Sequence, residues 1–447
     1  MKKELHSSLT AVEDNVSVAS PIKVFLSPSL SEARTSFVSK MGKDSRCRSE
    51  YSICMHVLGA FHSDVRAKRA ASALQEAGYE VSVIDIASQH PPQNEEDSDG
   101  ISVEHMQMPS SFTATATRFK QGAMIRAAWM FIRSTLRLLQ TRTDIYHALD
   151  LSALPACYVA ARLRRKPLIF ESYELPLHTL PLSEMSRSRR WLQALLTPLL
   201  KHMIPRCAGV IAVSPLIVQQ MRKYYPGSNI WLLRNIPPYQ VIAKNNLLRQ
   251  RLGLGLHVRL ALYQGALQTD RGLERLISAA AFLEQDSVIV LMGKGPDETV
   301  SRLEALIDRT GVTDRVKILP AVPYEQLLDW TASADIGLLI YSPDYSLNVQ
   351  MCLPNKLFEF LMAGLPVLAS QLDAVTEVVK THNVGQIVPS LAPEDIAAAI
   401  NAMVSDRDAL SQMHSNALDA AQHEFYWERE REQLFHMYAD VLARYKM

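Results

Sequence analysis

Two charged side chains, Lys356 and Glu359, lie three residues apart in the segment LPNKLFEFLMAGLPVLAS, residues 353–370. On a helix this spacing places both on one face. A helix N-terminus offers unpaired N–H groups and the positive end of a dipole, and a lysine there strengthens the resulting anion site. A carboxylate one turn further in can accept two hydrogen bonds from a vicinal diol such as ribose. This order predicts a nucleotide diphosphate along the helix start; the alternative is a surface ion pair.

The same segment predicts a loop, a helix, a turn and a strand in that order. Pro354 keeps the preceding residue extended, and Asn355 is a favoured N-cap residue. The apolar positions recur at helical spacing and form one stripe, made of Leu357, Phe358, Leu361 and Met362. Gly364 suits the helix end and Pro366 prevents continuation, so residues 367–369 read as a short buried strand.

The composition indicates a globular protein of two or three domains. The chain has 447 residues, of which 48% are hydrophobic and 21% charged. Its net charge of +1 gives no reason to expect nucleic-acid binding. No apolar run reaches the roughly 18 residues that a membrane span needs, and the first residues lack the apolar core of a signal peptide.

The cysteines point to a reducing compartment, so we expect a cytoplasmic location. There are five, odd in number and without a CxxC pair: Cys47, Cys54, Cys157, Cys207 and Cys352. This pattern offers neither a disulfide framework nor a metal site. We expect no metal and no cofactor. The triplet at residues 97–99, Asp-Ser-Asp, resembles a metal-binding DxD motif, but it follows no apolar strand and we interpret it as a chance match.

Strands and helices alternate along the rest of the chain in two successive halves. We expect residues 1–50 to be a disordered extension, with Met41 as an alternative start. Residues 51–240 and 241–425 each read as a Rossmann-like domain, and residues 426–447 as a final helix crossing back to the first domain. The predicted fold class is therefore α/β, with two doubly wound parallel-sheet domains facing across a cleft.

Polar side chains follow two predicted strands of the first half. His147 and Asp150 lie near the end of one, and Glu171 and Glu174 near the end of the next. Ligands of parallel α/β sheets bind beyond the carboxyl ends of the strands. These residues are therefore candidates for the site in the cleft.

Two stretches, residues 124–140 and 189–207, are amphipathic and rich in arginine, lysine and bulky apolar residues. Such helices bind an anionic membrane surface. They also occur as helices that pack on a core while their arginines reach the solvent. The sequence leaves both interpretations open.

In its second half above all, the chain resembles the GT-B glycosyltransferases of family 4, the retaining nucleotide-sugar transferases. The resemblance covers nearly everything from about residue 53 onward. It rests on motifs in the family's order: DVRAKRAASALQEAGYEVSVI, DIYHALD, LIFESYEL, IAVSPLIVQQM, YQGALQTDRGLERLI, GKGP, the P-N-K-x-x-E segment PNKLFEFLMAGLPVLAS, and YWE at residues 426–428.

The resemblance implies roles for the charged residues. Glu359 matches the glutamate expected on the nucleotide ribose, and Arg271 matches a residue expected on the diphosphate. Asn355 and Lys356 match the donor loop that holds the phosphates. His147 matches a histidine on the acceptor side, so the implied catalytic residues are His147, Arg271 and Lys356.

The resemblance also implies that glycines let the backbone approach the donor. Gly293 and Gly295 belong to the match with the nucleotide-binding turn, and the base is expected beside Val322. Gly59 and Gly265, which end the first strand of each half, belong to loops expected to face the donor.

The chain departs from the family's pattern at four positions, one of which is Ala266, where an arginine often follows the first glycine of the second domain. Many members have a glutamate where this chain has Met351, and Asn348 or Gln350 is then a candidate for binding sugar hydroxyls. The second histidine of the DIYHALD match is Leu149, and the histidine of the LIFESYEL match is Tyr173.

The resemblance implies transfer of a sugar from a nucleotide diphosphate to a hydroxyl, with retention and without a metal. We expect a lipid-linked or glycan acceptor in bacterial surface polysaccharide or glycoconjugate assembly, with peripheral contact to the anionic membrane. A non-catalytic GT-B protein that binds a nucleotide sugar or scaffolds an assembly complex is the alternative, and a hydrolysing epimerase of the same architecture is a third.

Overall fold

The computed structural model describes residues 51–86, 94–96, 100–107, 120–179, 186–268 and 271–445. The predicted disordered extension at residues 1–50 and the triplet at residues 97–99 lie outside these ranges.

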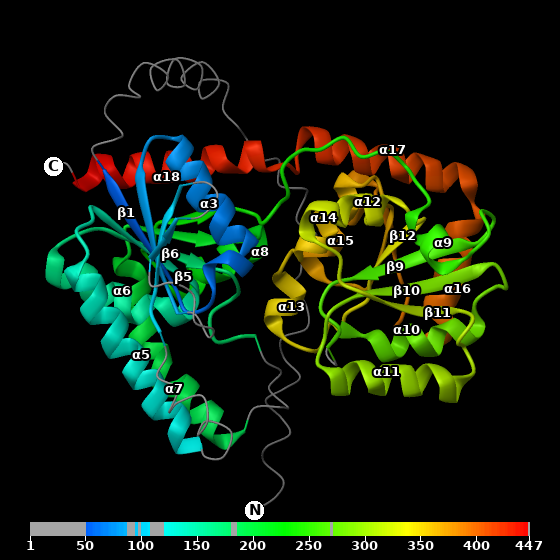
Figure 1. Cartoon of the computed structure of the whole chain (residues 1–447), viewed down its shortest axis with the longest axis horizontal. Coiled ribbons are helices and arrows are strands. Elements are labelled where there is room, and N and C mark those ends of the chain that lie inside the picture. The colour runs from blue at the N-terminus through cyan, green and yellow to red at the C-terminus, as the bar shows by residue number, and fades with distance from the viewer. Residues whose placement is uncertain are drawn as a thin grey trace, which may run out of the picture. The chain divides into compact units, whose positions relative to one another are not determined.

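The first α/β unit is built on an eight-stranded sheet in the order β3-β4-β2-β1-β5-β6-β7-β8 (Figure 1). All neighbours pair in parallel except β3 with β4. The strands are β1 (Ser52–Val57), β2 (Glu80–Asp85), β3 (Asn94–Glu96), β4 (Ser102–His105), β5 (Ile145–Leu149), β6 (Leu168–Ser172), β7 (Gly209–Ala212) and β8 (Ile230–Leu232). The chain moves outward from β1 in both directions, which creates a topological switch point between β1 and β5.

The helices of this unit connect and cover the strands. They are η1 (Phe61–Ser63), α3 (Val65–Glu76), α5 (Lys120–Gln140), α6 (Asp150–Arg164), α7 (Arg187–Met203), η3 (Ile204–Arg206) and α8 (Pro215–Tyr224). Two buried clusters flank the sheet; one includes Leu154 and Phe170, the other Leu74 and Ile169. Phe170 and Ile169 are adjacent in β6, so the two faces of this strand belong to different cores.

The second α/β unit has a six-stranded, fully parallel sheet in the order β11-β10-β9-β12-β13-β14. The strands are β9 (Arg259–Gln264), β10 (Ser287–Gly293), β11 (Val316–Pro320), β12 (Ile336–Leu339), β13 (Val367–Ala369) and β14 (Gly385–Ile387). Its helices are α9 (Leu247–Leu252), α10 (Leu273–Ala279), η5 (Ala280–Phe282), α11 (Asp297–Thr310), η6 (Tyr324–Gln326), α12 (Leu327–Ala332), α13 (Leu347–Met351), α14 (Asn355–Met362), α15 (Asp373–His382), α16 (Pro393–Ser405) and α17 (Arg407–His423). The predicted fold class, two doubly wound parallel-sheet domains, is confirmed.

The last helix, α18 (Trp427–Tyr445), packs against the first sheet rather than the second. Its Met437 lies against β7, where a Cβ at Gly209 would stand 3.2 Å from the methionine sulfur. Glycine at this position therefore lets the helix approach the sheet closely.

The helix that carries Lys356 and Glu359 differs from expectation at its start. α14 begins at Asn355, and its N-cap residue is Pro354, with φ −70° and ψ 143°. The prediction that Asn355 caps the helix is wrong, because Pro354 already supplies the extended residue before the first turn. Gly364 has φ +65°, as expected for a glycine that ends a helix.

Beyond its first residue, α14 is buried on every side. The predicted apolar stripe lies in the core, and Lys356 and Glu359 are also only 9% and 8% exposed. The alternative of a surface ion pair is therefore excluded.

Candidate active site

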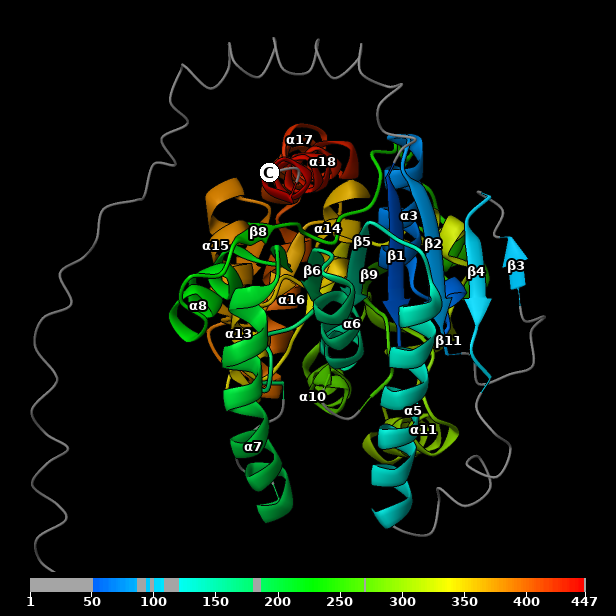
Figure 2. The same cartoon turned by 90° about the vertical axis from the view of Figure 1, so that its left-hand side faces the viewer.

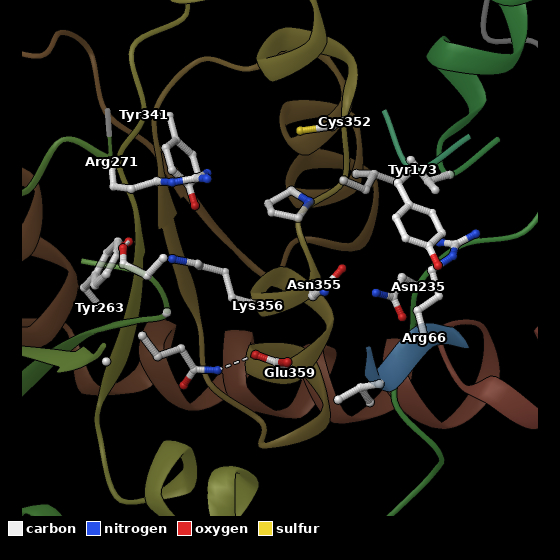
Figure 3. A pocket seen from close by; sticks show the side chains of 18 of the residues that line it. Arg66, Tyr173, Asn235, Tyr263, Arg271, Tyr341, Cys352, Asn355, Lys356 and Glu359 are labelled. Carbon is white, nitrogen blue, oxygen red and sulfur yellow. Dashed lines mark hydrogen bonds between the residues drawn. The ribbon is translucent and has the colours of Figure 1, made fainter. Parts of the chain in front are cut away.

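The described residues line a cavity of about 1130 Å³, formed by loops that follow strands of both sheets (Figure 3). From the first unit, Asp64, Arg66, Tyr173, Glu174 and Asn235 line it. From the second, the lining includes Tyr263, Gln264, Gly265, Arg271, Gly293, Lys294, Val322, Tyr341, Asn348, Asn355, Lys356 and Glu359. Most of the predicted donor-binding residues therefore meet in one place.

Two cations lie against aromatic rings inside this cavity. Lys356 Nζ is 3.7 Å from the centroid of the Tyr263 ring and 5.5 Å from that of Tyr341. The guanidinium carbon of Arg271 lies 5.6 Å from the same Tyr341 ring. Figure 3 shows both cationic groups reaching the same side of the cavity. Aromatic faces stabilise the cations, and a bound anion would stabilise them further.

The electrostatic state of Lys356 reflects this crowding. Burial and the neighbouring Arg271 lower the pKa of the Lys356 ammonium to about 7, although Glu359 partly opposes the shift. An anionic ligand would strongly stabilise the charged form of such an ammonium, because it offsets both the cost of burial and the repulsion from Arg271. The pair is suited to a diphosphate.

Glu359 is held by a hydrogen bond at one of its carboxylate oxygens. Gln264 Nε2 donates to Glu359 Oε2 at 2.6 Å, and Thr331 Oγ1 donates to Gln264 Oε1 at 2.7 Å. Burial raises the pKa of the Glu359 carboxyl, against the lowering effects of Gln264 and Lys356. The carboxyl lines the cavity one turn beyond Lys356, where it can accept hydrogen bonds from a diol.

Gly265 and Gly293 at the cavity are explained by the close approach of their two backbones. A Cβ on Gly293 would stand 1.7 Å from the carbonyl oxygen of Gly265, so only glycine allows these two strand ends to meet. Both glycines line the cavity, and Asn355, now free of a capping role, is exposed there. Val322 also lines the cavity, where the base is expected.

Three predicted site residues lie elsewhere: Gly59 and Gly295 are not among the cavity-lining residues, and His147 is fully buried. His147 Nδ1 lies 2.8 Å from the hydroxyl of Tyr438 in α18, and its Nε2 lies 3.2 Å from Glu171 Oε2. The expected position of His147 at the acceptor is therefore corrected, because α18 covers the face of β5 from which its side chain projects.

His147 nevertheless connects to the cavity through other side chains. Glu171 Oε1 also accepts a hydrogen bond from Arg66 Nε, and Arg66 lines the cavity. Burial alone would raise the pKa of Glu171, but Arg66 and His147 together lower it to about 2. A buried series of polar contacts, from Tyr438 through His147 and Glu171 to Arg66, thus runs from α18 to the cavity wall.

Sequence reasoning missed several lining residues, chiefly Gln264, Tyr263, Tyr341, Arg66 and Asn235. Gln264 ends β9 and Tyr341 follows β12 closely. The rule that ligands lie beyond strand ends could have flagged these two. Nothing in the local sequence marks Tyr263 as a partner of Lys356, which is 93 positions later.

Among the described residues, no group of three or more His, Cys, Asp or Glu side chains is arranged to hold a metal. In that same part of the chain, no helix combines the length and apolarity needed to cross a bilayer.

Two family profiles match the chain, one on each unit. The profile described as "Glycosyl transferase 4-like domain" matches residues 63–235, and "Glycosyl transferases group 1" matches residues 259–406. Together they cover more than half of the chain. The chain belongs to the group 1 glycosyltransferases.

Curated relatives of this group 1 chain include two differently named enzymes. It is 29% identical over 199 residues to a D-inositol 3-phosphate glycosyltransferase of Xylanimonas cellulosilytica, covering 44% of the chain and 46% of the relative. It is 23% identical over 251 residues to an alpha-D-kanosaminyltransferase of Streptomyces kanamyceticus, covering 54% and 62%. The first of these alignments spans about half of the relative's length.

Solved structures similar to this glycosyltransferase share its whole architecture. A sucrose-phosphate synthase from Thermosynechococcus elongatus superposes with a TM-score of 0.71 at 17% identity, covering 88% of this chain and all of that one. The Anabaena HepE protein, solved with UDP and glucose, gives 0.66 at 18% identity, covering 87% and 99%. This likeness shows that the fold is GT-B.

Proposed function

We propose that this group 1 glycosyltransferase transfers a sugar from a nucleotide diphosphate to a hydroxyl acceptor with retention of the anomeric configuration. The observation that carries the proposal is the convergence of Lys356, Arg271 and Glu359 at the start of α14, inside one cavity. Two cations and a helix N-terminus suit a diphosphate, and the carboxyl one turn further suits the ribose. The UDP in the HepE structure makes UDP the first nucleotide to test.

The proposed chemistry depends on stabilising the leaving diphosphate. Arg271 and Lys356 provide positive charge that is already in place before reaction, so metal is not required. An oxocarbenium-like centre needs little activation of the nucleophile. The departing phosphate oxygen then takes the proton of the acceptor hydroxyl, on the face from which it leaves. Closing the cleft excludes water and suppresses hydrolysis.

In this proposal His147 is a positioning residue. Its ring orients Glu171, which in turn fixes Arg66 at the cavity wall. It acts on the reaction through Arg66 rather than through contact with the acceptor.

Two helices, α5 and α7, support a proposal for where the acceptor is met. Neither contains an aspartate or glutamate, and each carries four lysines or arginines. Their large apolar side chains are exposed to solvent: Ile125, Phe131, Ile132, Leu136, Trp191, Leu192, Leu195 and Leu199. Figure 2 shows both helices extending beyond the strands in one direction.

This combination of charge and apolar exposure fits an anionic bilayer. Each helix precedes a parallel strand, so its N-terminal end lies at the sheet edge that lines the cavity. Docking would place a lipid-linked or glycan acceptor beside the cleft, at the cytoplasmic face of the membrane. Such an acceptor would be consistent with a role in bacterial surface polysaccharide or glycoconjugate assembly, which we propose on this ground.

A non-catalytic nucleotide-sugar-binding protein is the second candidate. The observation that favours it is Met351, since many family members carry a carboxylate at this position. A scaffold would bind a nucleotide sugar without acceptor-dependent turnover.

A thermal-shift panel with UDP, GDP, ADP and their common sugar conjugates, with and without EDTA, tests the proposal. A ligand at 100 times its dissociation constant adds about 2.7 kcal/mol to stability. We expect one diphosphate family to raise the melting temperature equally in EDTA, and turnover of its conjugate to need an acceptor. No shift with any nucleotide would reject both candidates.

A further inference from the structure

The first unit contributes two carboxylates to the cavity wall; that of Asp64 caps α3 and accepts from the Tyr173 hydroxyl, whereas that of Glu174 has no function assigned so far. Glu174 follows β6, lines the cavity and is exposed there. Ser172 Oγ donates to the Glu174 carbonyl oxygen at 2.7 Å and fixes the turn that presents the side chain. Burial and the Asp150 carboxylate raise the pKa of the Glu174 carboxyl. The guanidinium of Arg271, from the second unit, partly opposes this shift.

The loop that bears Glu174 is tied to the segment that precedes α14. Leu175 N donates to Asn348 Oδ1 at 2.8 Å, and Asn348 N donates to the His178 carbonyl oxygen at 3.2 Å. Asn348 is only 6% exposed. These two hydrogen bonds hold the loop against α13, so the backbone that carries Glu174 is fixed relative to the donor loop.

The donor loop has no carboxylate of its own at the position where the resemblance leads us to expect one. Met351 stands there and packs against the core of the first unit, while Ser214 Oγ donates to its carbonyl oxygen. The next residue, Cys352, lies near Glu174. Its thiol pKa is raised to about 12 by burial and, to a lesser degree, by the Glu174 charge. Glu174 and Cys352 both line the cavity, whereas Met351 does not, so Glu174 is a carboxylate on the cavity wall near the segment that lacks one.

We propose that Glu174 is the carboxylate that binds the hydroxyl groups of the transferred sugar, supplied from the first unit in place of a glutamate at position 351. A carboxylate accepts hydrogen bonds from two neighbouring hydroxyls. Its charge also faces the positive charge that develops at the anomeric carbon. This inference rests on the proposed function, because it requires a nucleotide sugar with its diphosphate at Arg271 and Lys356.

The test compares each nucleoside diphosphate with its sugar conjugate by calorimetry. The probe pairs are UDP with UDP-glucose, GDP with GDP-mannose, and ADP with ADP-glucose, titrated into wild type and Glu174→Gln. For the pair that wild type binds, we expect the conjugate to bind Glu174→Gln about 10-fold more weakly, because a charged acceptor of hydrogen bonds is lost. Affinity for the diphosphate itself should change less than two-fold.

A conservative variant and a control complete the experiment. Glu174→Asp, which keeps the charge and both acceptor oxygens, should retain more of the conjugate affinity than Glu174→Gln, with melting temperatures recorded to establish folding. Glu80→Gln, an exposed glutamate of β2, is the matched control and should change neither affinity.

The possible outcomes distinguish a failure of the Glu174 role from a failure of the proposed function on which it rests. Equal effects of Glu174→Gln on diphosphate and conjugate, or no effect on either, would overturn the role of Glu174 while leaving the donor site intact. Failure of wild type to bind any of the three diphosphates would overturn the proposed function, and this inference with it.

Discussion

Gln264 Nε2 donates to Glu359 Oε2 at 2.6 Å, and this amide is itself oriented by the hydroxyl of Thr331. The contact joins the end of β9 to the second turn of α14. The single proton of the Thr331 hydroxyl has two acceptors at 2.7 Å, the amide oxygen and the Leu327 carbonyl oxygen, and the amide nitrogen faces the carboxyl. The carboxyl proposed to bind ribose is thereby held in one orientation before any ligand arrives.

We expect Thr331→Val to weaken nucleoside diphosphate binding about five-fold, because loss of one buried hydrogen bond costs about 1 kcal/mol. Affinity for inorganic pyrophosphate, which has no ribose, should not change. Thr310→Val removes a hydroxyl of the same kind on the exposed surface of α11 and serves as the control. If Thr331→Val weakened the binding of nucleoside diphosphate and pyrophosphate equally, Thr331 would act on the phosphate site or on the fold rather than on the ribose site.

Lys356 predicts a pH dependence of both stability and binding. Burial and Arg271 lower its pKa in the folded state from 10.5 to about 7, and Glu359 partly opposes this. The unfolded chain therefore binds more protons between these two values, so this group lowers stability fully below about pH 7 and progressively less as pH rises. We expect Lys356→Met to stabilise the free protein at pH 6 and to do so less at pH 9.

Diphosphate binding should depend on pH in the opposite direction from stability and should be tighter at lower pH. The ligand favours the charged ammonium, so binding at pH 8 should take up a proton, measured as a dependence of the calorimetric enthalpy on the buffer's ionisation enthalpy. Lys223→Met, an exposed lysine of α8, is the control and should leave this uptake intact. Absence of proton uptake in wild type would contradict a buried, partly neutral Lys356.

The ion pair of Arg66 with Glu171 should contribute strongly to the stability of the first unit. Both side chains are buried, and Glu171→Gln leaves the guanidinium without its partner, which costs about 3 kcal/mol. Arg66 and His147, acting against burial, lower the Glu171 pKa from 4.5 to about 2. The stabilisation is therefore complete above pH 4.5 and is lost as pH falls toward 2.

Chemical denaturation of wild type and Glu171→Gln at pH 7 and pH 4 measures this difference. The gap between the two proteins should narrow at the lower pH. Glu274→Gln breaks an exposed pair with Arg302 and should cost less than about 1 kcal/mol at either pH. A pH-independent gap would mean that Glu171 is not ionised in the folded protein.

Contact of α5 and α7 with a bilayer predicts lipid selectivity. The protein should float with vesicles containing phosphatidylglycerol, bind vesicles of phosphatidylcholine alone much less, and dissociate in high salt. Ile132→Ser with Trp191→Ser should abolish flotation. Leu163→Ser replaces an equally exposed leucine on α6 and should not. If wild type, the double variant and Leu163→Ser bound the vesicles equally, α5 and α7 would not be the membrane-contacting helices.

The meeting of Lys356, Glu359 and Arg271 in one cavity agrees with what the sequence led us to expect. Helical spacing placed Lys356 over Glu359, and the resemblance to family 4 implied that Arg271 joins them at the diphosphate. Strand-end reasoning also pointed to Glu174, whose side chain does stand in the cavity.

Other features depended on contacts between distant segments. The position of His147 failed as a prediction because β5 is covered on that face by Tyr438, 291 positions later. The aromatic rings around Lys356 and the amide that holds Glu359 come from β9 and from the residues after β12. No periodicity links these to α14. The capping error at Asn355 arose because a preceding proline can itself serve as the extended residue.

The most direct test of the nucleotide site is calorimetric titration of wild type and Lys356→Met with UDP and UMP at pH 6.5, extended to the GDP and ADP pairs. For one base, wild type should bind the diphosphate at least about 10-fold more tightly than the monophosphate, as a charge-assisted contact to the second phosphate requires. Lys356→Met should lose most of that difference. Equal affinities for diphosphate and monophosphate in wild type, or an unchanged difference in Lys356→Met, would contradict a diphosphate site at the start of α14.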